Sequence, residues 1–573
     1  MAKSPRNQLI EFELEADAAV EAMSLATMSA RTSLTLLNTT VFGLLHVAGP
    51  KDREMWRTGD ALTYRISYLI PWLRKRRDDM IGAGAADVLQ AVQDRDPEMD
   101  DARNLGAYAH FCEVMPEVHR RRLEVELTAN GFRLVHPDAV FSVAEATDII
   151  VSELALNHVA DNRPRLPDDE IFDLARTAPV LDPVLLKSLL RRREQFYATN
   201  IREAPLVGDG VMTAVFGFDR ARFTRIQAAL FALSDVFTQL ALVLWIWSSE
   251  SDGAPSSEAL EWVTPCWNYK GFLDRVSALS GISPQEIESF VSHFALDYNR
   301  PPEEARGGDG FTPPFFRFGD SILFLPDLIP RYCQPRNVLA HMASAEKYRD
   351  LYDNLISGEL EPQLVSEVVD ALRSFDDLII KTNHKFFGGE FDLILCDSTG
   401  ENVIIFEVKA PLPPQGSRPT RRLAERIREG LSQIMRAREM DRLMLNDILK
   451  AALGVNVSNA RVEYVIMARA CFGAVEVWHE DAHQTAATLP LLRLALERVR
   501  EIGGSPPRDL IEALKNVTYQ VLREAGYRWE HASMPLFGRT IETPQLLYDN
   551  KAVDRWMRAS EAARQALGAQ GGS

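Results

Sequence analysis

The chain has 573 residues, of which 46% are hydrophobic and 25% charged, and this ordinary globular composition excludes a chain that is disordered throughout. Its formal net charge of −17 excludes a protein that coats nucleic acid with most of its surface, although an enzyme with one local basic groove remains compatible. The length predicts about three or four domains.

The cellular compartment is indicated by the cysteines and by two apolar features. The number of cysteines is odd and none forms a CxxC pair, so we expect no disulfide framework or structural zinc, which favours a reducing cytoplasm. The N-terminus lacks the apolar run of a signal peptide. Residues 228–247 are long enough to span a membrane, but Asp235, Thr238 and Gln239 interrupt them. We expect a buried central helix and no membrane partner.

Breaks rich in glycine and proline divide the chain into four parts. Residues 1–300 read as a mainly helical region, in one or two subdomains, whose role the sequence does not define and which is a candidate for binding a protein partner. Residues 301–344 read as a connecting segment with short strands. An α/β domain is expected over 345–500, and a helical C-terminal extension with a disordered tail over 501–573. The oligomeric state is not predicted.

The pattern after residue 336 predicts an α/β unit whose elements follow the order helix, three strands, helix, strand. Residues Asp397 to Gly400 form the hairpin turn between the second and third strands. Thr420 is the expected N-cap of the second helix. The expected ranges are 337–375 for the first helix, 377–386, 389–397 and 402–410 for the three strands, 421–445 for the second helix, and 461–472 for the last strand.

Three charged residues stand on otherwise apolar strands. Side chains alternate along a strand, so Asp392 shares a face with Ile394, and Glu407 shares one with Lys409. A charge inside a buried sheet is costly unless it is paired or bound to a metal. The carboxylates supply oxygen ligands that suit Mg²⁺ or Mn²⁺, and the carbonyl of Val408 is a third candidate ligand. Lys409 is expected to bind a phosphate oxygen, to lower the pKa of an attacking water, or to accept its proton.

The residues Glu390-Phe391-Asp392, then fourteen residues, then Glu407-Val408-Lys409 resemble the PD-(D/E)xK nuclease superfamily over residues 345–480. Phe391 stands where that family usually has proline. The resemblance implies a restriction-endonuclease-like α-β-β-β-α-β core and Mg²⁺-dependent hydrolysis of phosphodiester bonds, with Mn²⁺ as an alternative. It implies DNA more than RNA as substrate, and a role in bacterial defence against foreign DNA.

The resemblance also implies an acidic residue on the first helix, for which Glu361 and Glu367 are the candidates. At about 100° per residue, Glu361 falls at the centre of the apolar face, whereas Glu367 falls toward solvent. We therefore expect Glu361 to join Asp392 and Glu407 as a catalytic residue and metal ligand.

Basic residues on the second helix are candidates for nucleic-acid contact. Between residues 410 and 443, eight arginines face four acidic residues, a local net charge of 8 − 4 = +4. Many members of the superfamily that the chain resembles carry a glutamine on this helix. The predicted nucleic-acid-binding residues are Gln433, Arg422, Arg426, Arg436 and Lys385.

Two simpler interpretations stay open. The helix that carries these arginines can be an ordinary amphipathic helix with a solvated face, and the Glu407 and Lys409 pair can be a plain salt bridge in an inert hairpin. The nuclease-like fold would then serve as a nucleic-acid-binding or protein-interaction scaffold without catalysis.

Overall fold

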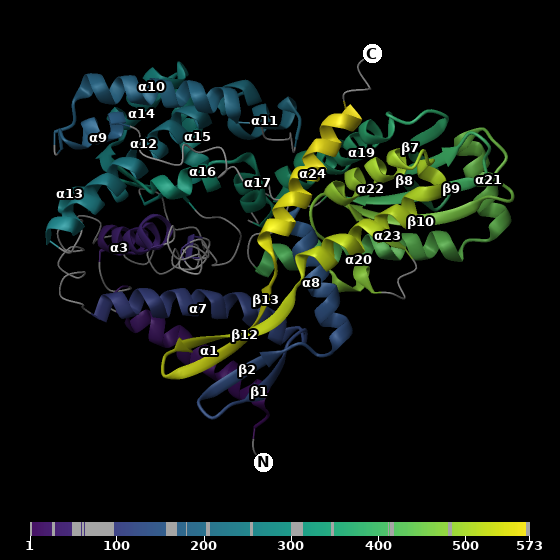
Figure 1. Cartoon of the computed structure of the whole chain (residues 1–573), viewed down its shortest axis with the longest axis horizontal. Helices are drawn as coiled ribbons and strands as arrows, with labels where there is room; N and C mark the ends of the chain where they lie inside the picture. Colours follow the sequence, from purple (N-terminus) through teal and green to yellow (C-terminus); the bar gives the residue numbers. More distant parts are fainter. Residues whose placement is uncertain are drawn as a thin grey trace.

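Helices form most of the computed structural model, and three sheets lie among them in the part of the chain that it describes (Figure 1). The described residues are 3–23, 25, 29–48, 59, 62–63, 97–155, 169–178, 180–201, 207–252, 256–298, 313–344, 349–410, 412, 417–479 and 484–568. The predicted disordered end, from residue 569, lies outside them.

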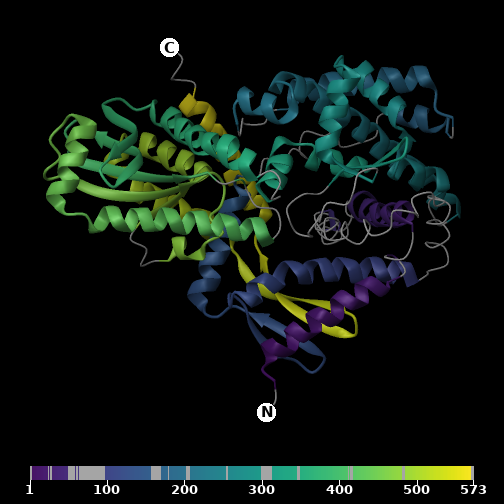
Figure 2. The ribbon, with the colours of Figure 1, turned by 180° about the vertical axis from the view of Figure 1, so that it is seen from behind.

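The described residues up to 344 are mainly helical, as predicted for 1–300, and we call them the helical lobe. Most of this lobe lies to one side of the α/β sheet, whereas α8 (Ala139–Glu153) contacts α23 (Pro506–Ala525) and α24 (Asn550–Gly568) (Figures 1 and 2). The helices are α1 (Pro5–Ala22), α3 (Ala30–Phe42), α7 (Pro97–His119), α8 (Ala139–Glu153), α9 (Asp169–Ala175), α10 (Pro183–Asn200), α11 (Asp209–Phe216), α12 (Arg220–Asp252), α13 (Ser257–Val263), α14 (Tyr269–Ser280), α15 (Pro284–Phe294), α16 (Ile329–Tyr332) and α17 (Pro335–Ser344).

Helix α12 is the central helix expected from the apolar run. It is long and apolar enough to cross a membrane, but 78% of its most apolar window is buried inside the protein. The buried carboxylate of Asp235 lies 3.2 Å from the Arg193 guanidinium on α10 and accepts a hydrogen bond from Gln239. These partners offset part of the cost of burying the Asp235 charge. The absence of a membrane partner stays a prediction.

Segments from the first and last quarters of the chain pair in one sheet, which the sequence patterns did not predict. Strands β1 (Glu124–Leu127) and β2 (Gly131–Val135) pair with the C-terminal hairpin β12 (Arg528–Leu536) and β13 (Arg539–Leu547) in the order β1-β2-β13-β12. The C-terminal extension contains the predicted helices, α23 (Pro506–Ala525) and α24 (Asn550–Gly568), and between them a hairpin that was not predicted.

The short strands expected in 301–344 are present, but they belong to a larger sheet. Strands β5 (Phe315–Phe318) and β6 (Ser321–Phe324) pair with β3 (Cys266–Asn268) and β4 (Ala295–Asp297) in the order β3-β6-β5-β4. The segment is thus continuous with the helical lobe before it.

The α/β sheet has the order β11-β10-β9-β8-β7, in which β9, β10 and β11 are parallel and β7 and β8 are antiparallel to their neighbours. Apolar residues of β9 point alternately to two helical layers: Ile405 packs toward α20 and α21, and Phe406 toward α19, α22 and α23. The bounds are α19 (Ser357–Leu372), β7 (Leu378–Phe386), β8 (Gly389–Asp397), β9 (Asn402–Lys409), α20 (Ser417–Glu439), α21 (Arg442–Leu453), β10 (Arg461–Ala468), β11 (Thr485–Thr488) and α22 (Leu489–Glu501).

The predicted order of elements is confirmed, with three corrections. The single helix expected over 337–375 is divided: α17 ends at Ser344, and the described chain resumes with α18 (Arg349–Leu351), a π-helical turn (Tyr352–Ile356) and α19, which ends at Leu372. Helix α20 begins at Ser417, so Thr420 lies inside it and is not its N-cap. The expected helix over 421–445 is two helices, because the Asp441 carboxylate accepts the N–H groups of Leu443 and Met444 and starts α21. Strand β11 was not predicted.

The predicted turn between β8 and β9 is organised by Asp397. Its carboxylate accepts hydrogen bonds from the Thr399 hydroxyl, the Glu401 N–H and both the N–H and the side-chain amide of Asn402. Gly400 has φ +78°, and a Cβ there would lie 2.4 Å from the Asn456 carbonyl oxygen. This turn fixes the register of the two strands that carry the charged residues.

Asp397→Ala is expected to lower the free energy of unfolding by about 1–2 kcal/mol at pH 7, because several donors lose their acceptor. Burial alone would raise the pKa of Asp397, but its hydrogen bonds lower it below its usual value. The stabilisation is therefore present above the unfolded pKa and is lost as the pH falls through the folded one. Urea unfolding at pH 7 and pH 3, beside the exposed Ser398→Ala, measures this, and equal stability of both variants at pH 7 contradicts it.

Candidate active site

Asp392 lies where the pairing of β8 with its two neighbouring strands is interrupted. The β8–β9 ladder has its last pair at Leu393 and Phe406, and the register on the other side gives Asp392 no pair with Asn383, which has φ +51°. The main chain of Asp392 is thus outside both ladders, and its Oδ2 accepts the Val408 N–H at 2.7 Å. The Asp392 carboxylate therefore accepts the hydrogen bond from β9 that a backbone group of β8 would accept in a regular ladder.

The distortion also changes the faces of β8. Phe391 was expected opposite Ile394, but it packs in the same cluster as Ile394 and Cys396, on the side of α20 and α21. Strict alternation therefore fails at Asp392. A left-handed Asn383 beside it is the backbone conformation that accompanies this local irregularity.

Glu407 and Lys409 share one face at the end of β9, as predicted. Their side chains are only 6% and 9% exposed, and the Lys409 Nζ lies 2.7 Å from Glu407 Oε1. The predicted salt bridge exists, but it is buried, where an ion pair contributes weakly to stability because desolvation offsets the attraction. Stability alone does not account for charges in this position.

Glu361 reaches the same place from α19. Its Oε1 lies 3.7 Å from Lys409 Nζ, and its side chain is 44% exposed, so it stands at the rim. Glu367 does not face solvent as expected: it is ion-paired to Arg469 at 2.6 Å and to Arg493 at 3.6 Å. Of the two candidates, the structure brings Glu361 to the charged cluster.

The electrostatics show an excess of negative charge. Burial raises the pKa of Asp392 and of Glu361, and burial together with Asp392 raises the pKa of Glu407 to about 7. Burial alone would lower the pKa of Lys409, but the three carboxylates raise it above its usual value. Three acids therefore surround one ammonium group, with a formal charge of −2 when all are ionised.

This donor set has the chemistry of a divalent-cation site. Carboxylate oxygens are the ligands of Mg²⁺ and Mn²⁺, and a second cation would offset the excess charge. Because the N–H of Val408 faces Asp392, its carbonyl is expected to face the same opening. Within the described ranges, however, no group of three His, Cys, Asp or Glu side chains is arranged to hold a metal. To bind a cation, Glu407 would have to give up its ion pair with Lys409.

The predicted nucleic-acid contacts are spread along two elements. Arg426 lies close enough to Glu361 to lower its pKa and is paired with Glu429 at 3.1 Å. Arg436 bonds back to the Ser432 carbonyl, on the exposed side of α20. Lys385 is 82% exposed and 4.0 Å from Glu390. The Gln433 Oε1 is buried and, among the described residues, accepts no hydrogen bond. The side chain of Arg422 lies outside the described residues.

Gly430 is a site residue that the sequence reasoning missed. It is buried on α20, and a Cβ there would lie 3.2 Å from Lys409 Cγ and 3.3 Å from Glu407 Cγ. The helix packs directly on the two charged side chains because this position has no side chain. A glycine inside a strongly amphipathic helix is the signal that could have identified it.

If the site hydrolyses phosphodiester bonds, as the resemblance implies, Gly430→Ala is expected to lower the cleavage rate by about tenfold or more, since the added methyl displaces Lys409 or Glu407 and small misplacements of reacting groups are costly. Its effect on stability should be small, because alanine favours the helix by about 1 kcal/mol and offsets the strain. Initial cleavage rates and thermal unfolding, beside Ser432→Ala on the exposed side of α20, measure both. Unchanged cleavage contradicts the packing argument.

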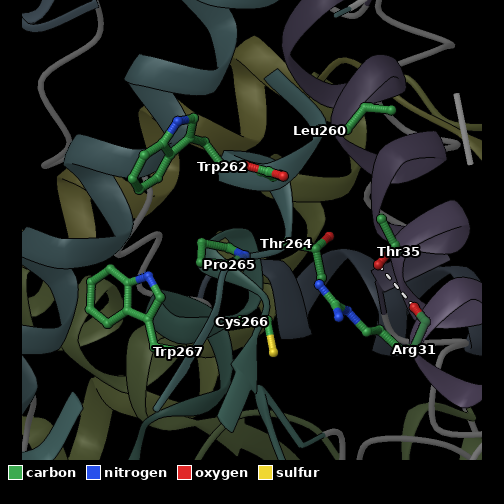
Figure 3. Close-up of a pocket in the computed structure, with 9 residues that line it drawn as sticks. Arg31, Thr35, Leu260, Trp262, Thr264, Pro265, Cys266 and Trp267 are labelled. Atoms are coloured by element: carbon green, nitrogen blue, oxygen red, sulfur yellow. Dashed lines mark hydrogen bonds between the residues drawn. The ribbon is translucent and has the colours of Figure 1, made fainter. Parts of the chain in front are cut away.

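A pocket of about 220 Å³ lies in the helical lobe, between α3 and the segment that joins α13 to β3 (Figure 3). Its lining comprises Arg31, Thr35, Leu260, Glu261, Trp262, Thr264, Pro265, Cys266 and Trp267. These elements carry none of the residues of the candidate active site.

Comparison of the chain with protein-family models, with curated proteins and with solved structures finds no match. The functional argument therefore rests on the site itself.

Proposed function

We propose that this protein is a nuclease that hydrolyses phosphodiester bonds with a divalent cation, Mg²⁺ or Mn²⁺, and that DNA is its substrate in preference to RNA. The observation that carries the proposal is the cluster of Asp392, Glu407 and Glu361 around Lys409, at the point where β8 and β9 separate. The agreement with the spacing of the PD-(D/E)xK superfamily supports the same reading.

Each group of the site has its own role in the proposed reaction. Asp392 and Glu407 would hold the cation, with the Val408 carbonyl and Glu361 at its margin. When bound, the cation polarises the scissile phosphodiester and stabilises the leaving oxygen. Lys409 has a raised pKa and keeps its proton, so we assign it to orienting a phosphate oxygen or the attacking water. The alternative in which Lys409 accepts a proton requires a lowered pKa and is not favoured.

The surroundings suit a nucleic-acid backbone. The segment 410–443 carries a net charge of +4 in a chain of −17, and Arg426 lies beside the cluster. Helix α20 also contacts α7 and α17 of the helical lobe. The substrate would therefore enter beside that lobe, which would contribute recognition. Defence against foreign DNA and a cytoplasmic location stay predictions.

One observation favours the alternative of a non-catalytic nucleic-acid-binding or protein-interaction scaffold. Glu407 and Lys409 are paired with each other, and the described acidic residues are not already arranged around a metal position. A scaffold would keep this ion pair permanently.

A screen separates the two functions. The full-length protein is incubated with supercoiled and linear duplex DNA, single-stranded DNA and RNA, each with Mg²⁺, Mn²⁺ or EDTA, beside Asp392→Ala. The nuclease proposal expects cation-dependent cleavage of DNA that Asp392→Ala abolishes. Cleavage by neither protein, or equal cleavage by both, overturns it and favours the scaffold.

A further inference from the structure

The hairpin between β7 and β8 carries an aromatic side chain into solvent. Phe387 is 95% exposed, the most exposed large apolar residue in the described part of the chain. It stands in a tight turn with Gly388, which has φ +96° and open space around it. Exposing a whole phenyl ring forfeits the free energy that its burial would supply, so the position requires an explanation.

The stem below the turn is rigid. Phe386 pairs with Gly389 across the hairpin, and its ring packs on Phe391 with the centroids 4.7 Å apart. A Cβ on Gly389 would lie 2.9 Å from the Phe386 ring, so the glycine permits this packing. Phe387 is consequently held on a stem with fixed direction, and its ring projects from the tip.

The turn lies at the same edge of the sheet as the candidate active site. Strand β7 is antiparallel to β8, which is antiparallel to β9, so β7 and β9 end at the same edge of the sheet. Lys409 ends β9, and Asp392 is three residues beyond Gly389 on β8. At about 3.3 Å per residue, the turn lies roughly 10 Å from Asp392, a span of about three stacked nucleotides.

The charges beside Phe387 indicate what it contacts. Lys381 and Lys385 are exposed on β7, and Lys385 is 82% exposed with only a 4.0 Å contact to Glu390. Gly388 and Gly389 follow Phe387, and the preceding Phe386 packs its ring on Phe391, so the described residues of this hairpin add no second exposed aromatic ring that would form the patch of a protein-binding surface. An exposed ring with an exposed lysine two residues before it matches the combination that binds nucleic acid, in which bases stack on aromatic rings and phosphates contact lysine.

We propose that Phe387 stacks on a nucleobase of the substrate a few nucleotides from the scissile phosphate, with Lys385 on the adjoining backbone. This inference rests on the proposed function, because it takes nucleic acid as the ligand. It adds a positioning residue outside the metal and acid cluster, and it predicts a preference for substrates whose bases can unstack: single strands, ends and forks.

The test measures stacking without cleavage. Oligonucleotides with 2-aminopurine at successive positions, as duplex, fork and single strand, are titrated with protein in EDTA while fluorescence and anisotropy are recorded. Wild type and Asp392→Ala should both change the fluorescence at one position on forks and single strands. Phe387→Ala should abolish that change and weaken binding by about 5- to 100-fold. Phe387→Trp should preserve both.

Phe387→Leu is the matched control, since it keeps an apolar side chain and loses the aromatic face. Binding by Phe387→Ala or Phe387→Leu equal to that of wild type overturns the stacking contact, and so does the lack of nucleic-acid binding by wild type. The outcomes separate the two proposals. If the protein cleaves nothing but still shows the 2-aminopurine response, the nuclease proposal fails and the stacking contact stands. If Phe387→Ala cleaves and binds as wild type does, the stacking contact fails and the nuclease proposal stands.

Discussion

Lys409→Met is expected to lower the single-turnover rate of DNA cleavage by about 100- to 1000-fold, the usual cost of removing one group that stabilises charge in a transition state. The ammonium lies 2.7 Å from Glu407 and 3.7 Å from Glu361, and its raised pKa keeps it charged at neutral pH. Methionine keeps most of the packing against Gly430 and removes only the charge. Binding of the divalent cation should not weaken, because the carboxylates remain.

Rapid-quench cleavage assays and calorimetric titration of Mn²⁺ give the two quantities separately. The matched control is Lys450→Met, on the exposed side of α21, which should cleave as wild type does. If Lys409→Met cleaves at the wild-type rate, Lys409 has no role in chemistry. If it loses both cleavage and cation binding, its role is to hold the carboxylates in place.

Glu407→Gln is expected to abolish cleavage and yet to stabilise the metal-free protein above pH 7. The Glu407 pKa of about 7 lies above its usual value of 4.5 because of burial and Asp392. A carboxyl whose folded pKa is raised loses stability as the pH rises from the unfolded pKa to the folded one. Glutamine avoids this loss, so the variant should gain up to about 3 kcal/mol at pH 8 and little at pH 4.

Denaturant unfolding in EDTA at pH 4, 6 and 8 checks the gain, with the exposed Glu401→Gln as the matched control. Saturating Mg²⁺ should then stabilise wild type and leave Glu407→Gln unchanged. A variant that is less stable than wild type at pH 8 would show that the ion pair with Lys409 outweighs the desolvation of Glu407. The acids would then be structural.

The strand positions of the charged residues could be predicted because they depend on local rules. Apolar runs broken by turn residues located β7, β8 and β9, and alternation placed Glu407 and Lys409 on one face. Helical periodicity selected Glu361 over Glu367, since the core defines the face of α19 that meets the sheet. These inferences need only the period of each element.

Other features could not be read from local patterns because they depend on contacts distant in the chain. The pairing of β13 with β2 joins residues separated by about 400 positions, and no periodicity encodes such a partner. The close approach of Gly430 to Lys409 likewise depends on how α20 packs on the sheet. The left-handed backbone of Asn383 departs from regular strand geometry, which alternation assumes. Glu367 was misassigned because Arg469 and Arg493 cover it.

Calorimetric titration of Mn²⁺ into the metal-free protein tests most directly whether these carboxylates form a divalent-cation site. Wild type and the exposed control Glu401→Gln should bind the cation saturably, and Asp392→Ala should bind it at least about tenfold more weakly. Equal binding by all three proteins, or no binding by wild type, would contradict the account, and the buried cluster around Lys409 would be an ion-pair network of the scaffold.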